Sequence, residues 1–394
     1  MIQLSNLNSV MEARYHFKNM ASVKNMMSSV KTKLALLSMI IILCLNQCSV
    51  KETNIQPIER YVGKLHISID PRMEILTTIQ LLANYPFVNE DLPYSEDIVN
   101  YFKSFSSHEA VLMTDSLLQK HRFAFDAPVN FMLHLSQLPK LERDIEFSNY
   151  VLMRSGRDDN LEEYRKHIQH FAGISNFEAF WNSKISYYNQ ILDLAIAELG
   201  ELDLVKVLED YFNEPKDDFK VIISPSFIGG FGPTITDANG NDVVYACIPF
   251  FTGIRLPLFT WHEFGHSFVN PLSDKYFDKV KSMNNLFEPI KENMTKQAYG
   301  EWQTCVNEHV IRAVVVRLVE LHYDTQFSKF LLEEMQLETK PSAFLLENEL
   351  MQGFIYIKPL FEKLKNFETQ RDENNITFTD YYPELLNALD NIQP

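Results

Sequence analysis

The sequence predicts an α+β fold that is mostly helical and contains a small β-sheet. Apolar residues recur at helical spacing through most of residues 71–212, and short runs rich in β-branched and aromatic residues appear after Pro215. The 394 residues are 46% hydrophobic and 22% charged, which is an ordinary globular balance. The chain therefore has enough apolar material for a large core, and we expect two subdomains packed tightly together.

The first 47 residues have the pattern of a secretory signal peptide. Two lysines precede the apolar run 34–45, which is too short to cross a membrane as a helix. A translation start at Met26 or Met27 would give a signal of ordinary proportions. We therefore expect residues 1–47 to be a signal peptide and the protein to be exported.

Leu45-Asn46-Gln47-Cys48 resembles a bacterial lipobox, in which the cysteine becomes the lipidated N-terminus after cleavage. Gln47 departs from that pattern, because Gly, Ala or Ser usually stands at this position. The resemblance implies a lipoprotein of the bacterial cell envelope, in the periplasm or outer membrane, with residues 48–60 as a tether. The lipid on Cys48 would be its contact with the membrane, and plain secretion is the alternative.

The mature chain is strongly acidic and poor in cysteine. Without residues 1–47, which hold five basic residues and one acidic residue, 31 basic residues face 51 acidic ones, a formal net charge of −20. Such a surface repels phosphates, so nucleic acid is not expected as a partner. Cys247 and Cys305 are too few for a disulfide framework. One bridge between them and two buried free thiols both remain open.

Residues 61–215 are predicted to form a mainly helical N-terminal subdomain. Alternation within residues 61–69 predicts a strand, and Asp70-Pro71 then begins a helix, with Asp70 as its cap. Further helices are expected around residues 98–105, 111–118, 145–153 and 185–199. The histidines of this part form no convincing ligand-spaced pair, so no chemistry is assigned to it.

Residues 216–394 contain the β-rich runs and the one motif that carries chemistry. Runs 219–223 and 243–248 are expected to pair, with a Gly-rich stretch at Gly229–Gly232 between them. The second strand is either an edge that pairs with an extended substrate or part of a plain structural hairpin. Residues 256–269 are predicted to form a helix that ends at Asn270-Pro271.

That helix carries the sequence HExxH at residues 262–266. His262 and His266 are one turn apart on the same face, so both imidazoles can bind one Zn²⁺ ion at about 2.0–2.1 Å. The metal lowers the pKa of a bound water, and Glu263 takes the proton of that water as general base. The residues around the motif are uncharged, which is typical of a helix buried behind a metal site.

Catalytic zinc sites usually have a third protein ligand. The metzincin pattern is excluded, because Val269 and Leu272 stand where it requires Gly and His. Residues 307–313 resemble the NExxxRA helix of gluzincins, in which a glutamate on a later helix completes the site. The resemblance implies Glu308 as the third ligand and a zincin (thermolysin-like) catalytic core in residues 216–394.

Burial gives an independent argument for Glu308, because an unpaired carboxylate on its apolar helix face would be costly. The competing interpretation is an ion pair with Arg312, one turn later. Glu301, two turns earlier, is the second candidate as a ligand or as a partner of a ligating histidine. Glu288 and Glu292 lie in a more polar segment and are weaker candidates.

The order of motifs also resembles an uncharacterised family of Bacteroidetes lipoprotein or secreted domains of unknown function. The resemblance covers roughly residues 60–360, through a strand and helix near 67–83, the segment 262–271 and the Glu308 helix. It implies a zinc-dependent peptidase-like fold and supplies no substrate.

Three hypotheses for function follow. The first is a zinc metallopeptidase, a hydrolase that cleaves peptide or protein substrates, with Tyr356 as donor to the developing oxyanion and His309 or Tyr299 as alternatives. The second is a catalytically inactive zincin-fold surface lipoprotein that acts as a binding module. The third is a metal-free helical envelope protein with a fortuitous HExxH.

Overall fold

The structure is a computed structural model that describes residues 55–199, 202–250, 255–324, 340–390 and 392. The predicted signal peptide and the predicted lipid site Cys48 lie outside the described residues. Within the described ranges, no helix combines the length and the apolar character that crossing a membrane requires.

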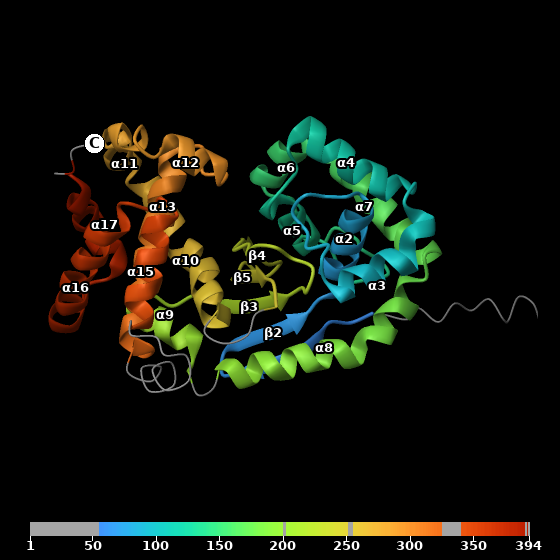
Figure 1. The fold of residues 1–394 in the computed structure, drawn as a ribbon, viewed down its shortest axis with the longest axis horizontal. Coiled ribbons are helices and arrows are strands. Elements are labelled where there is room, and N and C mark those ends of the chain that lie inside the picture. The colour runs from blue at the N-terminus through green and yellow to red at the C-terminus, as the bar shows by residue number, and fades with distance from the viewer. Residues whose placement is uncertain (1–54, 200–201, 251–254, 325–339, 391, 393–394) are drawn as a thin grey trace, which may run out of the picture. The chain divides into compact units, whose positions relative to one another are not determined.

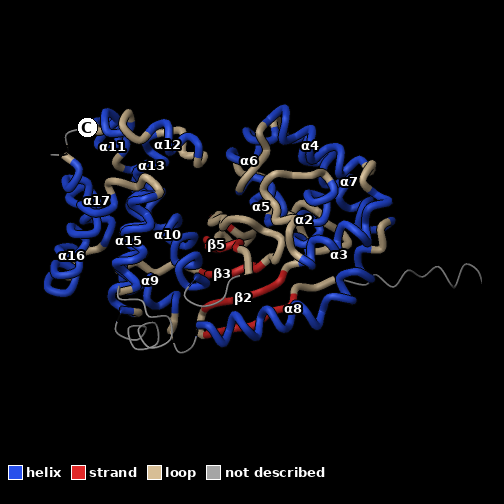
Figure 2. Tube along the Cα trace, viewed as in Figure 1, coloured by secondary structure: helices blue, strands red, loops and turns tan. Residues whose placement is uncertain are grey.

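Five strands form one mixed sheet in the order β1-β2-β3-β5-β4 (Figure 2). The pair β1/β2 is antiparallel, β2/β3 and β3/β5 are parallel, and β4/β5 is antiparallel. The sheet thus joins strands from the two ends of the long helical stretch. The bounds are Ile58–Val62 (β1), Leu65–Ile69 (β2), Asp218–Ile223 (β3), Thr234–Thr236 (β4) and Asp242–Ile248 (β5).

One prediction about strands is wrong, and one of two alternatives is excluded. Residues 61–69 are not one strand, because Gly63 has a φ of +57° and turns the chain between β1 and β2. Strand β5 is not an edge, because β3 pairs with one side of it and β4 with the other. The pairing on that outer side continues through Phe231, which exchanges two backbone hydrogen bonds with Cys247, each 2.9 Å long.

Helices fill the region between β2 and β3, as predicted. Asp70 caps the first of them by accepting a hydrogen bond from the backbone N–H of Arg72 at 2.8 Å. The bounds are Pro71–Leu82 (α2), Pro93–Phe102 (α3), Glu109–His121 (α4), Asp126–Leu133 (α5), Asn149–Ser155 (α6), Asp158–Ile174 (α7), Phe177–Leu199 (α8) and Leu204–Phe212 (α9). Helix α8 lies along β1 and β2 (Figure 1).

A second group of helices follows the sheet (Figure 1). Their bounds are Arg255–Lys275 (α10), Phe277–Ser282 (α11), Lys291–Lys296 (α12), Trp302–His322 (α13), Pro341–Met351 (α15), Ile357–Asn374 (α16) and Phe378–Leu386 (α17), with short 3-10 turns at Lys103–Phe105, Asn284–Phe287 and Asn387–Leu389. The described part of the chain therefore confirms a mostly helical α+β fold with a small sheet.

Helix α10, which carries the HExxH sequence, runs past its predicted end. Pro271 lies inside the helix, although it cannot donate the usual backbone hydrogen bond. The turn after it is held by Ser273, whose buried hydroxyl bonds Asn307 of α13 and Tyr382 of α17. Tertiary contacts thus outweigh the local helix-breaking tendency of proline.

Aromatic contacts fix α10 against the sheet and α9. Trp261 donates its indole N–H to the carbonyl of Leu204 at 3.2 Å. The rings of Phe268 and Phe212 stack at 4.2 Å, and the ring of Phe264 meets Phe219 of β3 at 4.9 Å. These side chains are almost completely buried, so they stabilise the helix mainly through apolar burial.

Candidate metal centre

His262, His266 and Glu308 come together between α10 and α13. The Nε2 atom of His262 lies 3.5 Å from Oε2 of Glu308, and Nε2 of His266 lies 3.6 Å from Oε1 of Glu308. One ligand atom from each residue lies within 4.8 Å of the other two. The three side chains therefore form a group that can hold a metal ion.

Close helix packing brings Glu308 to the histidines. Gly265 lies between His262 and His266 in the sequence of α10. A Cβ atom on Gly265 would be 3.1 Å from the side chain of Ile311 on α13. The small residue lets the two helices approach at the level of the site. The bond between Ser273 and Asn307 joins the same helices farther along and fixes their relative positions.

Two observations support a metal ion at this donor set. Ligands at about 2.0–2.1 Å in a tetrahedron are about 3.4 Å apart, close to the histidine–glutamate distances of 3.5 and 3.6 Å. In addition, Oε2 of Glu308 is buried and forms no hydrogen bond of good geometry among the described residues, and its cationic neighbour is the Arg312 guanidinium at 3.3 Å. A metal ion would add the close contact that this ion pair lacks.

The protonation states also suit a cation. Burial is the largest influence on His262 and lowers its pKa to about 3, so the ring stays neutral and keeps a lone pair for a metal. Burial alone would raise the pKa of Glu308, but His262, Arg312 and His266 outweigh it and lower that pKa. The site therefore offers the neutral imidazole of His262 and an ionised carboxylate beside His266.

Glu263 lies beside this group and is covered by the segment before β4. Its Oε2 atom is 4.0 Å from Nε2 of His266, and burial, with a further contribution from Glu308, raises its pKa. A Cβ atom on Gly230 would be 2.2 Å from the Glu263 carboxylate, and one on Gly232 would be 2.3 Å from the Glu263 backbone oxygen. A side chain at position 232 would clash with backbone, whereas one at position 230 would displace the Glu263 carboxylate.

Arg312 links Glu308 to two further residues. Its guanidinium lies 3.3 Å from Glu308, donates to Glu349 of α15 at 2.8 Å and donates to the hydroxyl of Tyr299 at 3.4 Å. The ion pair considered as an alternative to metal binding is thus present together with the metal-type geometry. Arg312 contacts the Glu308 carboxylate while both histidines face it, so the two interpretations are compatible.

Asn270 was not predicted as a site residue. Its side-chain oxygen lies 3.3 Å from Nδ1 of His266, which leaves Nε2 of that ring for a metal when Nδ1 carries the proton. The sequence suggested only that Asn270-Pro271 ends the helix. Because the helix continues, Asn270 stands one turn after His266, and that spacing could have suggested the contact.

Three other candidates, Tyr356, His309 and Glu301, lie outside the metal-type group. Tyr356 is buried, and its hydroxyl donates a hydrogen bond to the carbonyl of Leu286 at 2.7 Å. A role for Tyr356 as donor to a substrate oxyanion therefore gains no support. The ring of His309 packs against Tyr356, and its Nδ1 lies 2.6 Å from the carbonyl of Cys305. Glu301 is exposed at the start of α13 and does not join the metal-type group.

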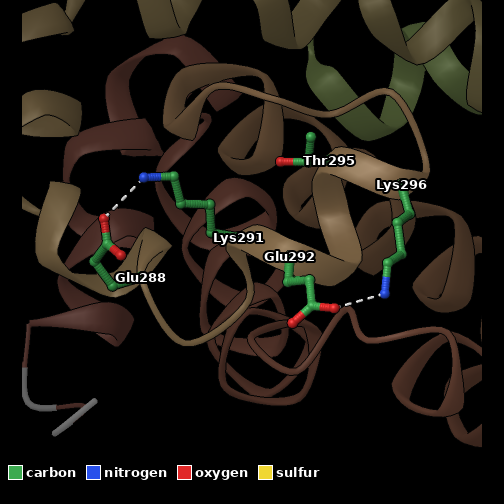
Figure 3. Close-up of a pocket in the computed structure, with 5 residues that line it drawn as sticks. All are labelled: Glu288, Lys291, Glu292, Thr295 and Lys296. Atoms are coloured by element: carbon green, nitrogen blue, oxygen red, sulfur yellow. Dashed lines mark hydrogen bonds and ion pairs between the residues drawn. The ribbon is translucent and has the colours of Figure 1, made fainter.

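The other acidic candidates, Glu288 and Glu292, line a shallow hollow on and beside α12. Its lining residues are Glu288, Lys291, Glu292, Thr295 and Lys296, and none of them belongs to the metal-type group (Figure 3). Lys291 pairs with Glu288 at 3.2 Å and Lys296 pairs with Glu292 at 2.7 Å. Both carboxylates are therefore exposed partners of lysines.

The two cysteines of the described chain are buried free thiols, so the alternative of a disulfide is excluded. Fold and site together define a mostly helical α+β protein with a buried His-His-Glu group that can hold a metal ion. The chain belongs to the family described as "Domain of unknown function (DUF4932)", whose model matches residues 65–388. Comparisons with curated proteins and with solved structures gave no match.

Proposed function

We propose that this protein is a zinc-dependent peptidase of the gluzincin type, with a zincin core built on α10 and α13. The observation that carries the proposal is the place of Glu308. A carboxylate far from HExxH in the sequence reaches both histidines, one with each oxygen, while Arg312 pairs with it at 3.3 Å from another direction. A chance HExxH on a packing helix gives no reason for that arrangement.

The chemistry follows from the residues around the group. A zinc ion held by His262, His266 and Glu308 supplies a bound water of lowered pKa and polarises a substrate carbonyl. Glu263 accepts the proton of the attacking water and passes it to the leaving amine. A divalent cation beside Glu263 also opposes the burial and the negative charge that raise the pKa of this carboxyl.

Tyr299 replaces Tyr356 as the proposed donor to the developing oxyanion. Its hydroxyl accepts from Arg312, which leaves the hydroxyl proton free to donate, and its pKa is raised by burial and by Glu308. The side chain is half-buried, so a substrate can reach it. Arg312 orients both Tyr299 and Glu308, which makes it a positioning residue.

A peptide suits the surroundings of Glu263. Strand β4 ends the sheet, so its outer side has no strand neighbour among the described residues. The segment 229–232 before it covers the Glu263 carboxylate. An extended peptide that pairs with this edge would pass beside the general base, in the manner of β-augmentation.

The test is cleavage of a mixed peptide library by the mature chain, read by mass spectrometry. We expect wild-type protein to cleave peptides and Glu263→Gln to lose at least about 100-fold in rate, the range of general-base catalysis. Zinc should be retained, because Glu263 is not a ligand. The control Glu292→Gln removes the same charge from exposed α12 and should keep full activity.

The outcomes separate the hypotheses. Zinc binding without cleavage in the wild type would contradict the peptidase and support a zincin-fold binding module. Absence of zinc would leave a metal-free helical protein. Cleavage that persists in Glu263→Gln would assign the activity to other residues.

We also propose that the protein is exported and anchored to the cell envelope through a lipid on Cys48. The basis is the short apolar run 34–45 followed by the lipobox-like residues 45–48. The mass of the native N-terminus tests this. A diacylglyceryl group on Cys48 is the expected result, and an unmodified N-terminus near this position would indicate plain secretion.

A further inference from the structure

A continuous series of contacts leads from Glu263 to the loop between α4 and α5. Gly230 touches the Glu263 carboxylate, and three residues earlier Phe227 forms a bridge with Val88. Next to Val88, the ring of Phe87 meets the ring of Phe125 at 4.4 Å.

The loop itself holds a strained and well-supported conformation. Phe125 has a φ of +61° and a ψ of −121°, a region that residues with a side chain rarely adopt. Arg154 of α6 donates hydrogen bonds to the carbonyls of Arg122 and Ala124 and so supports the residues just before it. Strain of this kind is found preferentially at binding and catalytic sites. The phenyl ring is nevertheless 39% exposed.

Asp126, the first residue of α5, follows Phe125 in the chain and is half-buried. Its Oδ1 atom accepts a hydrogen bond from Tyr150, and no ion pair found among the described residues includes it. Burial is the largest cause of its raised pKa, while Arg154 and His266 act in the opposite direction. Asp126 in turn contributes to the raised pKa of Glu263.

We propose that Asp126 and Phe125 form a specificity site for a cationic nitrogen of the substrate. This inference rests on the proposed peptidase activity. A carboxylate fixed by Tyr150 gives a charge-assisted hydrogen bond, and the adjacent aromatic ring adds a cation–π contact. The cation is either the free N-terminal amine of a peptide or the side chain of lysine or arginine.

The competing role for Asp126 is purely structural. A carboxylate in the first turn of a helix interacts favourably with the helix dipole, and Tyr150 bonds it to α6. Under that role, loss of the charge lowers the stability of the fold. It does not change which peptides are cleaved relative to one another, and this difference decides the experiment.

The experiment uses matched peptide pairs on the zinc-loaded mature chain. One arm compares a free with an acetylated N-terminus, and the second compares lysine with norleucine at each position. The measured quantity is the ratio of kcat/KM within a pair, which does not depend on the folded fraction of a preparation. Wild type, Asp126→Asn and the control Asp115→Asn, an exposed carboxylate of α4, are compared.

We expect wild type to prefer the cationic member in one arm by about ten- to hundredfold, the range of a hydrogen bond to a charged group. Asp126→Asn should lose that preference and Asp115→Asn should keep it. The arm that shows the preference identifies the source of the cation. Cleavage without any cationic preference, or a preference that survives Asp126→Asn, overturns this inference and leaves the peptidase intact. Absence of all cleavage overturns both.

Discussion

Two buried carboxylates, Glu308 of α13 and Glu74 of α2, differ in what surrounds them. Glu308 faces two histidines and Arg312, and these groups lower its pKa although it is buried. Glu74 of α2 accepts a hydrogen bond from Tyr94, whose hydroxyl lies 2.6 Å from that of Tyr188. Burial raises the pKa of Glu74 to about 7.

The comparison shows that burial alone does not mark a functional acid. Both side chains are about equally inaccessible, at 4% for Glu308 and 1% for Glu74. Groups that are cationic or can bind a cation keep Glu308 ionised, whereas hydroxyl partners leave Glu74 protonated at acidic pH. Glu308 therefore fits a ligand, and Glu74 fits a neutral structural acid. Four experiments test these two carboxylates and the residues around the metal-type group.

The largest effect is expected on metal binding. Glu308→Gln replaces an anionic ligand by a weakly binding amide, so zinc affinity should fall well beyond the 10- to 100-fold typical of a residue that only supports a ligand. Glu74→Gln should leave zinc affinity unchanged. Competition with a chromogenic chelator measures both. Equal losses in the two variants would remove the distinction between the carboxylates.

The next effect concerns the position of the general base. Gly230→Ala places a methyl group where the Glu263 carboxylate lies, so that carboxylate must move, while Gly229→Ala meets nothing within 4 Å. We expect Gly230→Ala to lower peptide cleavage by about 100-fold or more with zinc retained. Gly229→Ala should behave as wild type. If the two variants have the same rate, Gly230 does not fix the working position of the Glu263 carboxylate.

The pH dependence of stability tests Glu74. Its unfolded-state pKa is near 4.5 and its folded-state pKa is about 7, so its contribution is fully present below pH 4.5 and is lost as the pH rises through 7. The loss is about 3 kcal/mol of unfolding free energy. Urea unfolding at several pH values should show Glu74→Gln gaining that amount relative to wild type.

The control for this experiment is Glu96→Gln, which removes an exposed carboxylate from α3. Its stability should follow the wild-type pH curve. A constant difference between Glu74→Gln and wild type across the range would show that Glu74 titrates normally in the fold.

The smallest effect is expected from the residue that supports His266. Asn270→Ala removes the partner of Nδ1 and frees the ring to change tautomer, so zinc affinity should fall about 10- to 100-fold. Asn270→Asp keeps an acceptor at the same place and should recover most of that loss. Wild-type affinity in Asn270→Ala would mean that the 3.3 Å contact has no role in binding.

The metal-type group could be predicted from sequence because helical periodicity encodes it. His262 and His266 share a face by their spacing, and Glu308 could be chosen because a carboxylate between apolar residues at helical intervals needs a partner. Tyr356 is predicted from its residue type alone. Nothing in its surrounding sequence shows that its hydroxyl donates a hydrogen bond to the backbone carbonyl of Leu286. The importance of Tyr299 depends on Arg312, a contact between separate segments.

In the fold, too, local features were predictable from the sequence and contacts between distant segments were not. The helix start at Asp70-Pro71 was predictable because the cap is local, and the β-rich runs were visible as such. The turn at Gly63 was missed because the flanking residues alternate as in one strand. The place of β5 inside the sheet and the passage of α10 through Pro271 depend on distant partners, β4 for the first and Asn307 with Tyr382 for the second.

The central claim is that one zinc ion is held by two imidazoles and one carboxylate between α10 and α13. Zinc-edge X-ray absorption of the purified mature chain, loaded with one equivalent of zinc, tests it directly. The account predicts four ligands at about 2.0–2.2 Å, two of them with imidazole scattering, and loss of that spectrum in Glu308→Gln. A spectrum without imidazole contributions, or one unchanged by Glu308→Gln, would contradict it.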